Sequence, residues 1–317
     1  MLDMVFASSH GLLVMRRNAA LAGLLASCGV LLIGLSGYYL LLNRGPAPIK
    51  RQFVAATHGL TQSNQAPTAQ RIARGIVPTP VPILMFHYVR SVSQADDPLG
   101  YDLSIEPTLF ASYLDRLRLA GYETITPAQF LSGTVPTKSI MLTFDDGYED
   151  FYQTAYPELS ERGMTAVIFV ISSFLDDADG RYLTRAQVKT LSDAGIEIGS
   201  HTVDHVNLAT ASTQRAQDEL LISRQVLEQL IGKRVEAIAY PSGKYNDTAL
   251  RFADYVGYSF GVTTESGTAL PTSNRLQLPR IRVRGGESAD DLVSAIERSS
   301  NQQAPIPQDE QSDPLQH

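Results

Sequence analysis

Short apolar runs alternate with longer amphipathic stretches between about residue 79 and residue 298. Each short run is rich in β-branched residues, which is typical of a strand buried on both faces. The pattern predicts strands at Ile83–His87, Ile140–Phe144, Ala166–Ile171, Ile196–Ser200, Val235–Tyr240, Tyr258–Val262 and Arg280–Val283.

The amphipathic stretches between these runs have the period of helices. We expect helices at Pro107–Ala120, Asp150–Arg162, Arg185–Ala194, Thr213–Ile231, Asp247–Val256 and Ala289–Ser299. Alternating strands and helices predict an α/β fold with a parallel sheet and right-handed crossovers. About seven strands favour a distorted (β/α) barrel, and a doubly wound open sheet is the alternative. In such barrels the chemistry lies at the carboxyl ends of the strands.

An uncharged apolar run covers residues 18–42 and is long enough to cross a bilayer as a helix. We predict an N-terminal transmembrane helix there, after a cytoplasmic segment at residues 1–17. A cleaved signal peptide, a lipoprotein signal ending at Cys28 and a buried core helix are the alternatives. Basic residues lie on both sides of the run, so the positive-inside rule does not decide its orientation.

The remaining segments have linker-like or tail-like composition. Residues 43–78 are rich in Pro, Gln, Thr and Ala, which predicts a linker. Residues 299–317 are polar and contain proline, and we predict a disordered tail. The catalytic domain is therefore expected to span residues 79–298.

Composition narrows the class of protein. The chain has 317 residues, 44% hydrophobic and 19% charged, with a formal net charge of -7, so no basic surplus indicates nucleic-acid binding. No protein partner can be inferred. Cys28 is the single cysteine, so the domain has no intrachain disulfide and must be stabilised by its own core. Trp is absent, so any ring that stacks on a sugar must be Tyr or Phe.

Two adjacent carboxylates, Asp145 and Asp146, follow the second predicted strand directly, and Gly147 then permits a tight turn. Adjacent acids repel, so placing both in a cleft is costly unless a cation or a proton lies near them. A solvated turn is the alternative, because Asp and Gly are common in turns.

Two histidines, His201 and His205, follow the fourth predicted strand. Their spacing suits one side of a helical turn and two ligands on one metal, although two surface histidines are the alternative. One carboxylate with two histidines leaves open positions for water and substrate. Zn²⁺ is the default ion, with Co²⁺, Ni²⁺ or Mn²⁺ as alternatives. The second carboxylate can then act as general base on the water.

Two further strand ends carry polar residues. His87 ends the first predicted strand, either as a structural histidine or as the general acid that protonates a leaving amine. The segment Ala239–Asn246 closes another strand. Its backbone N–H groups suit an oxyanion, whereas the alternative is a plain loop in which Asn246 caps the next helix.

The stretches TFDDG at 143–147 and HTVDH at 201–205 resemble the two most diagnostic motifs of the polysaccharide deacetylase family. The family is also called the NodB-homology domain or carbohydrate esterase family 4, and the resemblance covers about residues 79–298. It implies a distorted (β/α) barrel that removes N-acetyl groups from polymers of N-acetylglucosamine, such as peptidoglycan, chitin-like chains or poly-N-acetylglucosamine. The resemblance assigns Asp145 as base, His87 as acid, and Asp146, His201 and His205 as metal ligands. We also expect Tyr148, Tyr240, Pro241 and Ser242 to contact the substrate or the oxyanion.

The chain departs from the more familiar branch of the family. Ala239–Ser242 stands where that branch has Arg-x-Pro-Tyr, and its late Leu-x-His motif is missing, since only His317 follows the histidine pair. The arginine expected to orient the base is missing too, and Arg280 or Arg282 is the candidate replacement. Arg185 stands where relatives often have Trp.

The inferred substrate places the catalytic domain outside the plasma membrane, as a single-pass protein whose partners are the polysaccharide and the membrane. Two other functions stay open. One is an O-deacetylase of the same fold, similar to acetylxylan esterases, and the other is a catalytically silent glycan-binding protein.

Overall fold

The computed structural model describes residues 79–133 and 135–303. The predicted cytoplasmic segment, transmembrane helix and linker lie outside the described residues, as does the predicted tail from residue 304. Among the described residues, no helix is long and apolar enough to span a membrane. The strands are β1 (Ile83–Phe86), β2 (Tyr88–Val89), β3 (Ser104–Ile105), β4 (Glu123–Thr124), β5 (Ser139–Phe144), β6 (Val167–Val170), β7 (Glu197–Ser200), β8 (Ala237–Ala239), β9 (Phe260–Ser266) and β10 (Leu278–Arg282). The α-helices are α3 (Pro98–Leu103), α4 (Pro107–Leu119), α5 (Pro127–Ser132), α6 (Tyr156–Glu161), α7 (Arg185–Asp193), α8 (Thr213–Ile231), α9 (Asp247–Val256) and α10 (Ala289–Gln303).

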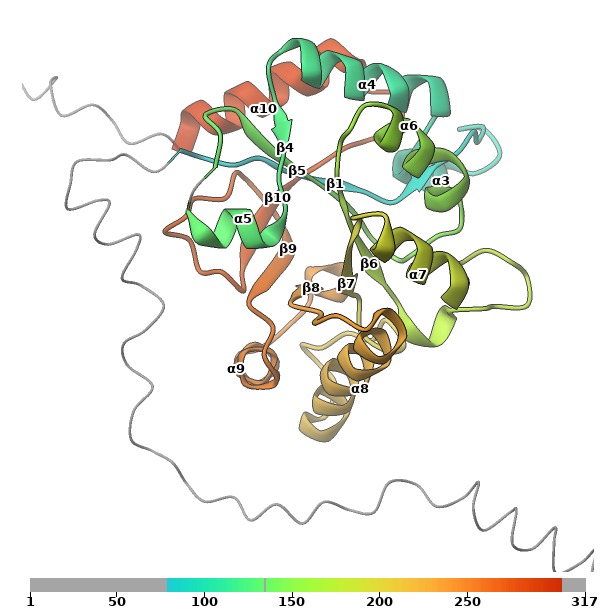
Figure 1. The fold of residues 1–317 in the computed structure, drawn as a ribbon, viewed down its shortest axis with the longest axis vertical. Helices are drawn as coiled ribbons and strands as arrows, with labels where there is room; N and C mark the ends of the chain where they lie inside the picture. Colours follow the sequence, from blue (N-terminus) through green and yellow to red (C-terminus); the bar gives the residue numbers. More distant parts are fainter. Residues whose placement is uncertain (1–78, 134, 304–317) are drawn as a thin grey trace, which may run out of the picture. The chain divides into compact units, whose positions relative to one another are not determined.

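Seven parallel strands close into a barrel (Figure 1). Their order is β1-β10-β9-β8-β7-β6-β5, and β5 pairs again with β1, with Ile83 opposite Met141 and Phe86 opposite Phe144. The short strand β4 extends β5 on one side. The predicted barrel is confirmed. An open doubly wound sheet would not have the β1–β5 pairing, so that alternative is wrong.

The barrel interior is filled by alternate residues of the strands, as the period of two requires. These inward residues form a compact apolar cluster that includes Ile83, Met141, Val167, Phe169, Phe260, Val262 and Leu278. Gly199 makes room for one of them, because a Cβ there would meet the ring of Phe169 at 2.4 Å. Phe130 of α5 packs edge-on against Phe260 and closes one end of the barrel.

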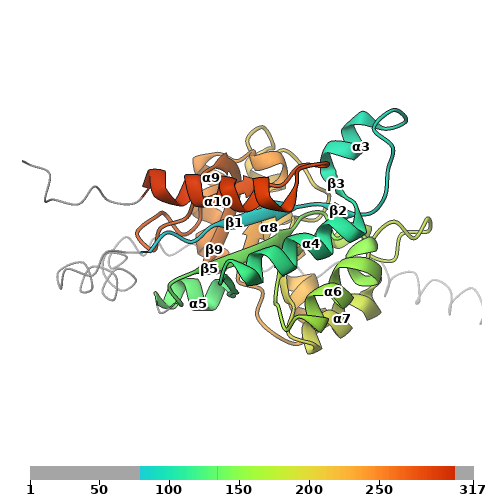
Figure 2. The ribbon, with the colours of Figure 1, turned by 90° about the horizontal axis from the view of Figure 1, so that it is seen from above.

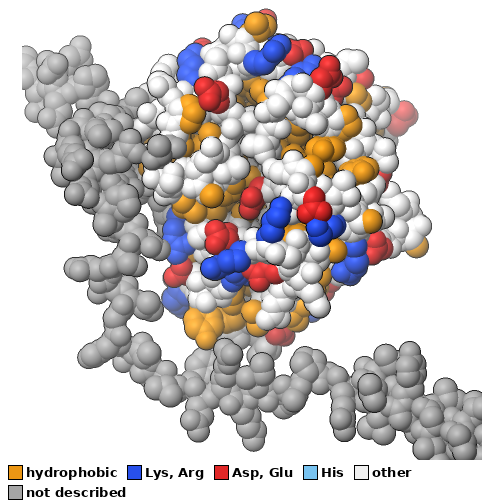
Figure 3. All heavy atoms as spheres, in the orientation of Figure 1, with side chains coloured by type: hydrophobic (Ala, Val, Ile, Leu, Met, Phe, Trp, Pro, Cys, Tyr) orange, Lys and Arg blue, Asp and Glu red, His pale blue; other side chains and the backbone are white. Residues whose placement is uncertain are grey.

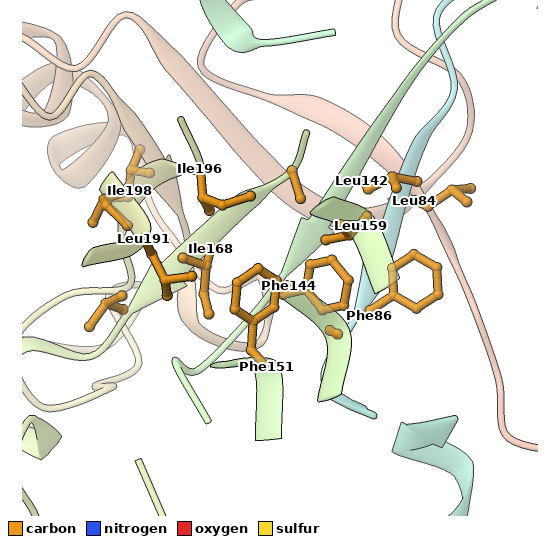
Figure 4. Packing of buried hydrophobic residues seen from close by; sticks show 14 of the residues in the cluster. Leu84, Phe86, Leu142, Phe144, Phe151, Leu159, Ile168, Leu191, Ile196 and Ile198 are labelled. Atoms are coloured by element: carbon orange, nitrogen blue, oxygen red, sulfur yellow. The ribbon is translucent and has the colours of Figure 1, made fainter. Parts of the chain in front are cut away.

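The outward residues form a larger core between the barrel and the helices. Figure 4 shows three phenylalanine rings of this layer, from β1, β5 and the turn that follows β5. Phe86 and Phe144 are stacked with centroids 5.0 Å apart, and Phe151 meets Phe144 edge-on at 4.8 Å. Each buried side chain of this size contributes about 1.5–3 kcal/mol through removal of apolar surface from water.

The helices surround the barrel, and the last one lies beside the first long one. Figures 1 and 2 both show α10 alongside α4, where Arg116 forms an ion pair with Asp290. Figure 2 also places α5 and α3 at opposite ends of the barrel. Acidic and basic side chains are mixed over the face shown in Figure 3, and exposed pairs of this kind contribute little to stability.

The structure corrects four of the sequence-based helices or helical regions. The helices α3 and α5 were not predicted, although each begins with a proline after a capping side chain, Asp97 or Thr126. The predicted helix at 150–162 is a π-helical turn, Phe151–Ala155, followed by α6. Helix α10 continues to Gln303, four residues beyond the predicted end at Ser299.

Candidate active site

The site lies at the carboxyl ends of the barrel strands, which we call the mouth. The inward alternation of β1, β5, β7 and β10 extends to His87, Asp145, His201 and Arg282. Because all strands are parallel, these four positions meet at one end of the barrel. The barrel thus brings together residues that are up to 195 positions apart in the sequence, His87 after β1 and Arg282 at the end of the neighbouring strand β10.

Asp145 is buried and bonded to a buried arginine. Arg280 donates to both of its carboxylate oxygens, at 2.8 and 2.7 Å. The same guanidinium donates to Thr143 Oγ1 at 3.0 Å and to the carbonyl of Thr263 at 2.8 Å, which fixes its orientation. Burial alone would raise the pKa of Asp145, but the Arg280 charge and its hydrogen bonds outweigh burial and lower it. Asp145 is therefore ionised, and Arg280 rather than Arg282 is the arginine that contacts it.

Asp146 faces the two histidines because its backbone is left-handed. Strand alternation would point adjacent carboxylates in opposite directions, but a φ of 73° at Asp146 ends the strand and redirects its side chain. Asp tolerates this conformation better than most residues. One oxygen of Asp146 lies 3.3 Å from His201 Nε2 and 3.5 Å from His205 Nε2. The three ligand atoms all lie within 4.8 Å of one another.

The tautomer of His201 suits a metal ligand. Its Nδ1 lies 2.7 Å from the carbonyl oxygen of Ala239, which can only accept, so Nδ1 carries the proton and donates. In the neutral ring, Nε2 then presents a lone pair toward the Asp146 carboxylate. Two lone pairs at 3.3 Å repel unless a cation lies between them or Nε2 is protonated. Without an ion, the pKa of His201 is raised: burial lowers it, but Asp146 and Asp145 more than compensate.

The loop that carries the histidines is not helical, which corrects the predicted helical turn. Thr202 and His205 have φ values of 68° and 55°, so each adopts the left-handed conformation. Thr202 Oγ1 accepts the N–H of His205 at 3.1 Å, and Ser200 Oγ accepts the N–H of Thr202 at 3.1 Å. Side chains next to the ligands therefore hold a loop conformation that the His spacing alone did not predict.

Glu219 of α8 holds this loop from outside and was missed in the sequence. It is 1% exposed, and one carboxylate oxygen accepts the N–H groups of Val203 and Asp204 at 2.8 and 2.9 Å. Arg215 pairs with Glu219 at 2.7 Å and also with Asp204. A glutamate within the buried stripe of an amphipathic helix, beside Leu220, is the signal that could have identified it.

His87 lies half-buried just after β1, within electrostatic reach of both carboxylates. Burial lowers its pKa, the charges of Asp145 and Asp146 raise it, and those of Arg280 and Arg282 lower it again, so that the net shift is downward. His87 is thus brought to the same end of the barrel as the predicted base and ligands.

The loop after β8 divides its residues between two environments. The side chain of Tyr240 points outward, is 0% exposed and packs on Tyr245 with centroids 4.6 Å apart, so this side chain is turned away from the mouth and the contact of Tyr240 with substrate or oxyanion stays a prediction. Pro241 starts a tight turn in which exposed Ser242 has a φ of 52°. The N–H of Gly243 is bonded to the Tyr240 carbonyl, and Pro241 has no N–H, so Ser242 is the candidate donor for an oxyanion. Asn246 caps α9, as predicted.

Tyr148 lies within a column of aromatic rings beside Asp146. Its ring stacks on Tyr88 at 3.7 Å and on Tyr182 at 5.1 Å, and Arg90 covers the far face of this column at 3.6 Å from the Tyr88 centroid. Burial and the Asp146 charge both raise the pKa of Tyr148, so its hydroxyl keeps its proton. Arg185, by contrast, begins α7 at the surface and pairs with Asp176.

Comparison with known proteins agrees with this geometry. Residues 132–261 match the family model described as polysaccharide deacetylase. The Bacillus subtilis protein YxkH, which bears the name of a polysaccharide deacetylase, is 35% identical over 225 residues, 69% of this chain and 77% of that protein. A Staphylococcus aureus protein named poly-beta-1,6-N-acetyl-D-glucosamine N-deacetylase is 27% identical over 196 residues, 57% of this chain and 68% of that protein.

A solved structure shows the same fold. The Streptococcus pyogenes deacetylase PplD, in complex with acetate, superimposes with a TM-score of 0.65 at 33% identity, over 69% of this chain and 98% of that one. The chain belongs to the polysaccharide deacetylase family, and it is a hydrolase of carbohydrate esterase family 4.

Proposed function

We propose that this protein is a metal-dependent enzyme that removes N-acetyl groups from polysaccharide containing N-acetylglucosamine, such as peptidoglycan, chitin-like chains or poly-N-acetylglucosamine. The observation that carries the proposal is the division of labour between two adjacent carboxylates. Asp145 is bonded to a buried guanidinium, whereas Asp146 faces two imidazole nitrogens. One environment suits an ionised base and the other suits a cation.

The ligand set fits a divalent metal. Asp146, His201 and His205 supply one oxygen and two nitrogens, which is the donor set of many Zn²⁺ sites, with Co²⁺, Ni²⁺ or Mn²⁺ as alternatives. When bound, such an ion would polarise the acetyl carbonyl and lower the pKa of a water molecule toward neutrality. The hydrogen bond from His201 to the Ala239 carbonyl keeps Nε2 free for this purpose.

Asp145 would act as the general base. Arg280 holds its carboxylate ionised and in one orientation, so that it can accept the proton of the attacking water. The same ion pair makes Asp145 a weak base, because it lowers the pKa of the conjugate acid. Asp145 can therefore take a proton only from a water whose acidity has been raised.

His87 would act as the general acid. An amide nitrogen must be protonated before it leaves, and His87 is the histidine at the mouth that is not in the ligand set. Its lowered pKa makes the imidazolium a stronger donor once it forms beside Asp145 and Asp146. The N–H of Ser242 would donate to the oxyanion of the tetrahedral intermediate.

The substrate preference rests on similarity and on surface chemistry. The name of the Staphylococcus aureus relative specifies an N-acetylated glucosamine polymer. The half-buried rings of Tyr148 and Tyr182 lie next to Asp146 and offer hydroxyl groups and ring edges to a sugar. This supports a carbohydrate amide as the substrate.

Acetate release by the purified full-length chain tests the proposal. We expect release from an N-acetylglucosamine oligomer that stops with chelator and returns with Zn²⁺. Asp145→Asn should abolish release while metal binding persists, and His205→Ala should weaken metal binding as well. Release only from O-acetylated xylan would make the protein an O-deacetylase, and glycan binding without any acetate release would make it a binding protein.

Residues 18–42 would anchor the domain on the outer side of the plasma membrane, since the proposed substrates are outside the cell. Protease treatment of intact cells checks this proposal. The domain should be digested in intact cells, and a domain that stays protected until the membrane is disrupted would refute this location.

A further inference from the structure

Arg282 is a second arginine at the mouth, which the proposed mechanism does not use. It is the last residue of β10 and shares the inward face of that strand with Leu278 and Arg280. In the sheet it pairs with Met85 of the neighbouring strand β1, two residues before His87. Its guanidinium lies close enough to His87 and Asp145 for the charges to interact. Arg282 is therefore the next inward residue after Arg280 along β10.

This guanidinium has no partner of its own. Both oxygens of Asp145 are bonded to Arg280, and Asp102 pairs with Arg284 at 2.7 Å. Over residues 79–133 and 135–303, the Arg282 side chain makes no ion pair and no hydrogen bond. The side chain is nevertheless half-buried, and burial together with the charge of Arg284 lowers its pKa.

Partial burial of a cation without an anion costs free energy, and no structural hydrogen bond or ion pair of this side chain offsets that cost. A guanidinium presents a planar fork of donors that matches a carboxylate and holds it in two parallel hydrogen bonds. A neutral sugar hydroxyl would satisfy one donor and leave the charge uncompensated. The missing partner is therefore best supplied by the substrate.

We propose that Arg282 binds a carboxylate carried by the glycan, so that the site prefers an acidic polysaccharide over a neutral N-acetylglucosamine homopolymer. This proposal rests on the proposed deacetylase function and narrows its substrate class. Among the glycans considered above, peptidoglycan strands carry carboxylates.

The test compares one glycan in two charge states. A peptidoglycan-derived oligomer is used with its carboxylates free and after their conversion to carboxamides, and kcat/KM for acetate release is measured for both. The variants are Arg282→Gln, Arg282→Lys and, as a matched control, Arg284→Gln, since Arg284 is exposed two residues after the end of β10 and is already paired with Asp102. Thermal unfolding confirms that each variant is folded.

In the full-length wild type, kcat/KM should be about ten- to hundredfold higher for the acidic form than for the carboxamide form. This ratio corresponds to the free energy of hydrogen bonds to a charged group. This ratio should fall to near one in Arg282→Gln, take an intermediate value in Arg282→Lys and stay unchanged in Arg284→Gln. The ratio is the proper readout, because the Arg282 charge also lowers the pKa of His87 and its loss would change turnover of both forms alike.

A ratio near one in the wild type, or a ratio that Arg282→Gln does not change, would overturn the proposal. Inhibition by acetate tests whether the carboxylate that Arg282 binds is the released product and not a group of the glycan. If Arg282→Gln weakens inhibition by acetate and leaves the ratio intact, Arg282 binds the released product and the glycan proposal is wrong. If the wild type releases no acetate from either oligomer, the proposed function fails, and calorimetric binding of the two oligomers still decides whether Arg282 recognises the carboxylate.

Discussion

The buried pair of Arg280 and Asp145 permits a quantitative prediction about stability. Arg280 is 1% exposed and makes four hydrogen bonds, two of them to Asp145, which is 4% exposed. Arg280→Met would leave an uncompensated carboxylate inside the barrel, and removal of one member of a buried pair costs about 3–5 kcal/mol. We expect a loss of that size in the free energy of unfolding at pH 7.

The double variant Asp145→Asn with Arg280→Met should be more stable than Arg280→Met alone by about 1–3 kcal/mol, because it removes both charges. The pH dependence should also invert. In the wild type the lowered pKa of Asp145 adds stability above the pKa of the unfolded chain, and this stability is lost as pH falls. In Arg280→Met the largest opposing charge is gone and only the charges of His201 and His87 oppose burial, so we expect burial to raise the pKa of Asp145 and the variant to recover stability as pH falls from 8 to 5.

Urea unfolding of the four proteins, in the presence of chelator so that metal binding adds nothing, measures these differences. Arg284→Met is the matched control. Its pair with Asp102 has the same 2.7 Å distance, but the two side chains are 61% and 43% exposed, so the loss should stay below about 1 kcal/mol. The reasoning is refuted if Arg280→Met costs no more than Arg284→Met, or if the double variant is no more stable than Arg280→Met.

Three further predictions follow from side chains around the site. Glu219→Gln should weaken Zn²⁺ binding about 10–100-fold, because a neutral side chain holds the N–H groups of Val203 and Asp204 less firmly. Calorimetry measures this affinity, and an unchanged value would contradict the role of Glu219. Burial raises the pKa of Asp150 to about 6, so the folded protein retains a proton that the unfolded chain releases near pH 4, and stability should fall by at most about 3 kcal/mol as pH rises from 4 to 7. Asp150→Asn should remove this slope, and an identical slope in the variant would show that another group causes it. Asn246→Ala should cost about 1 kcal/mol in urea unfolding through loss of the α9 cap, and a loss below about 0.3 kcal/mol would count against the cap.

The sequence predicted the strands well because each one is a short apolar run bounded by polar residues. Each of the seven predicted runs overlaps a barrel strand, and several of these strands carry the predicted polar residues at their carboxyl ends. Parallel strands place these ends together without any knowledge of long-range pairing. The closing contact of β1 with β5 could not be predicted in this way, because it depends on register across the whole sheet.

Local conformation was harder to predict than location. The histidine spacing indicated a helical turn, but Thr202 and His205 are left-handed because the Ser200 and Thr202 hydroxyls and Glu219 bond the loop N–H groups. The outward direction of the Tyr240 side chain follows from strand alternation, since Ala239 points inward. Strand alternation places both Arg280 and Arg282 on the inward face of β10, so it could not decide which of them pairs with the base. That depends on how deep each residue lies along β10, and Arg280 is the one that bonds Asp145.

The adjacent carboxylates have different chemistry because one backbone dihedral separates them. Asp145 still follows the strand and points inward to Arg280, whereas Asp146 has a φ of 73° and turns toward His201 and His205. Gly147 continues the turn at φ 76°, where a Cβ would lie 3.3 Å from the Val170 backbone. If both residues were extended, one carboxylate would point into the outer apolar core and could not stay ionised there. The turn thus converts two repelling acids into one group held by an arginine and one group exposed to a cation, which is the separation of roles that the proposed reaction needs.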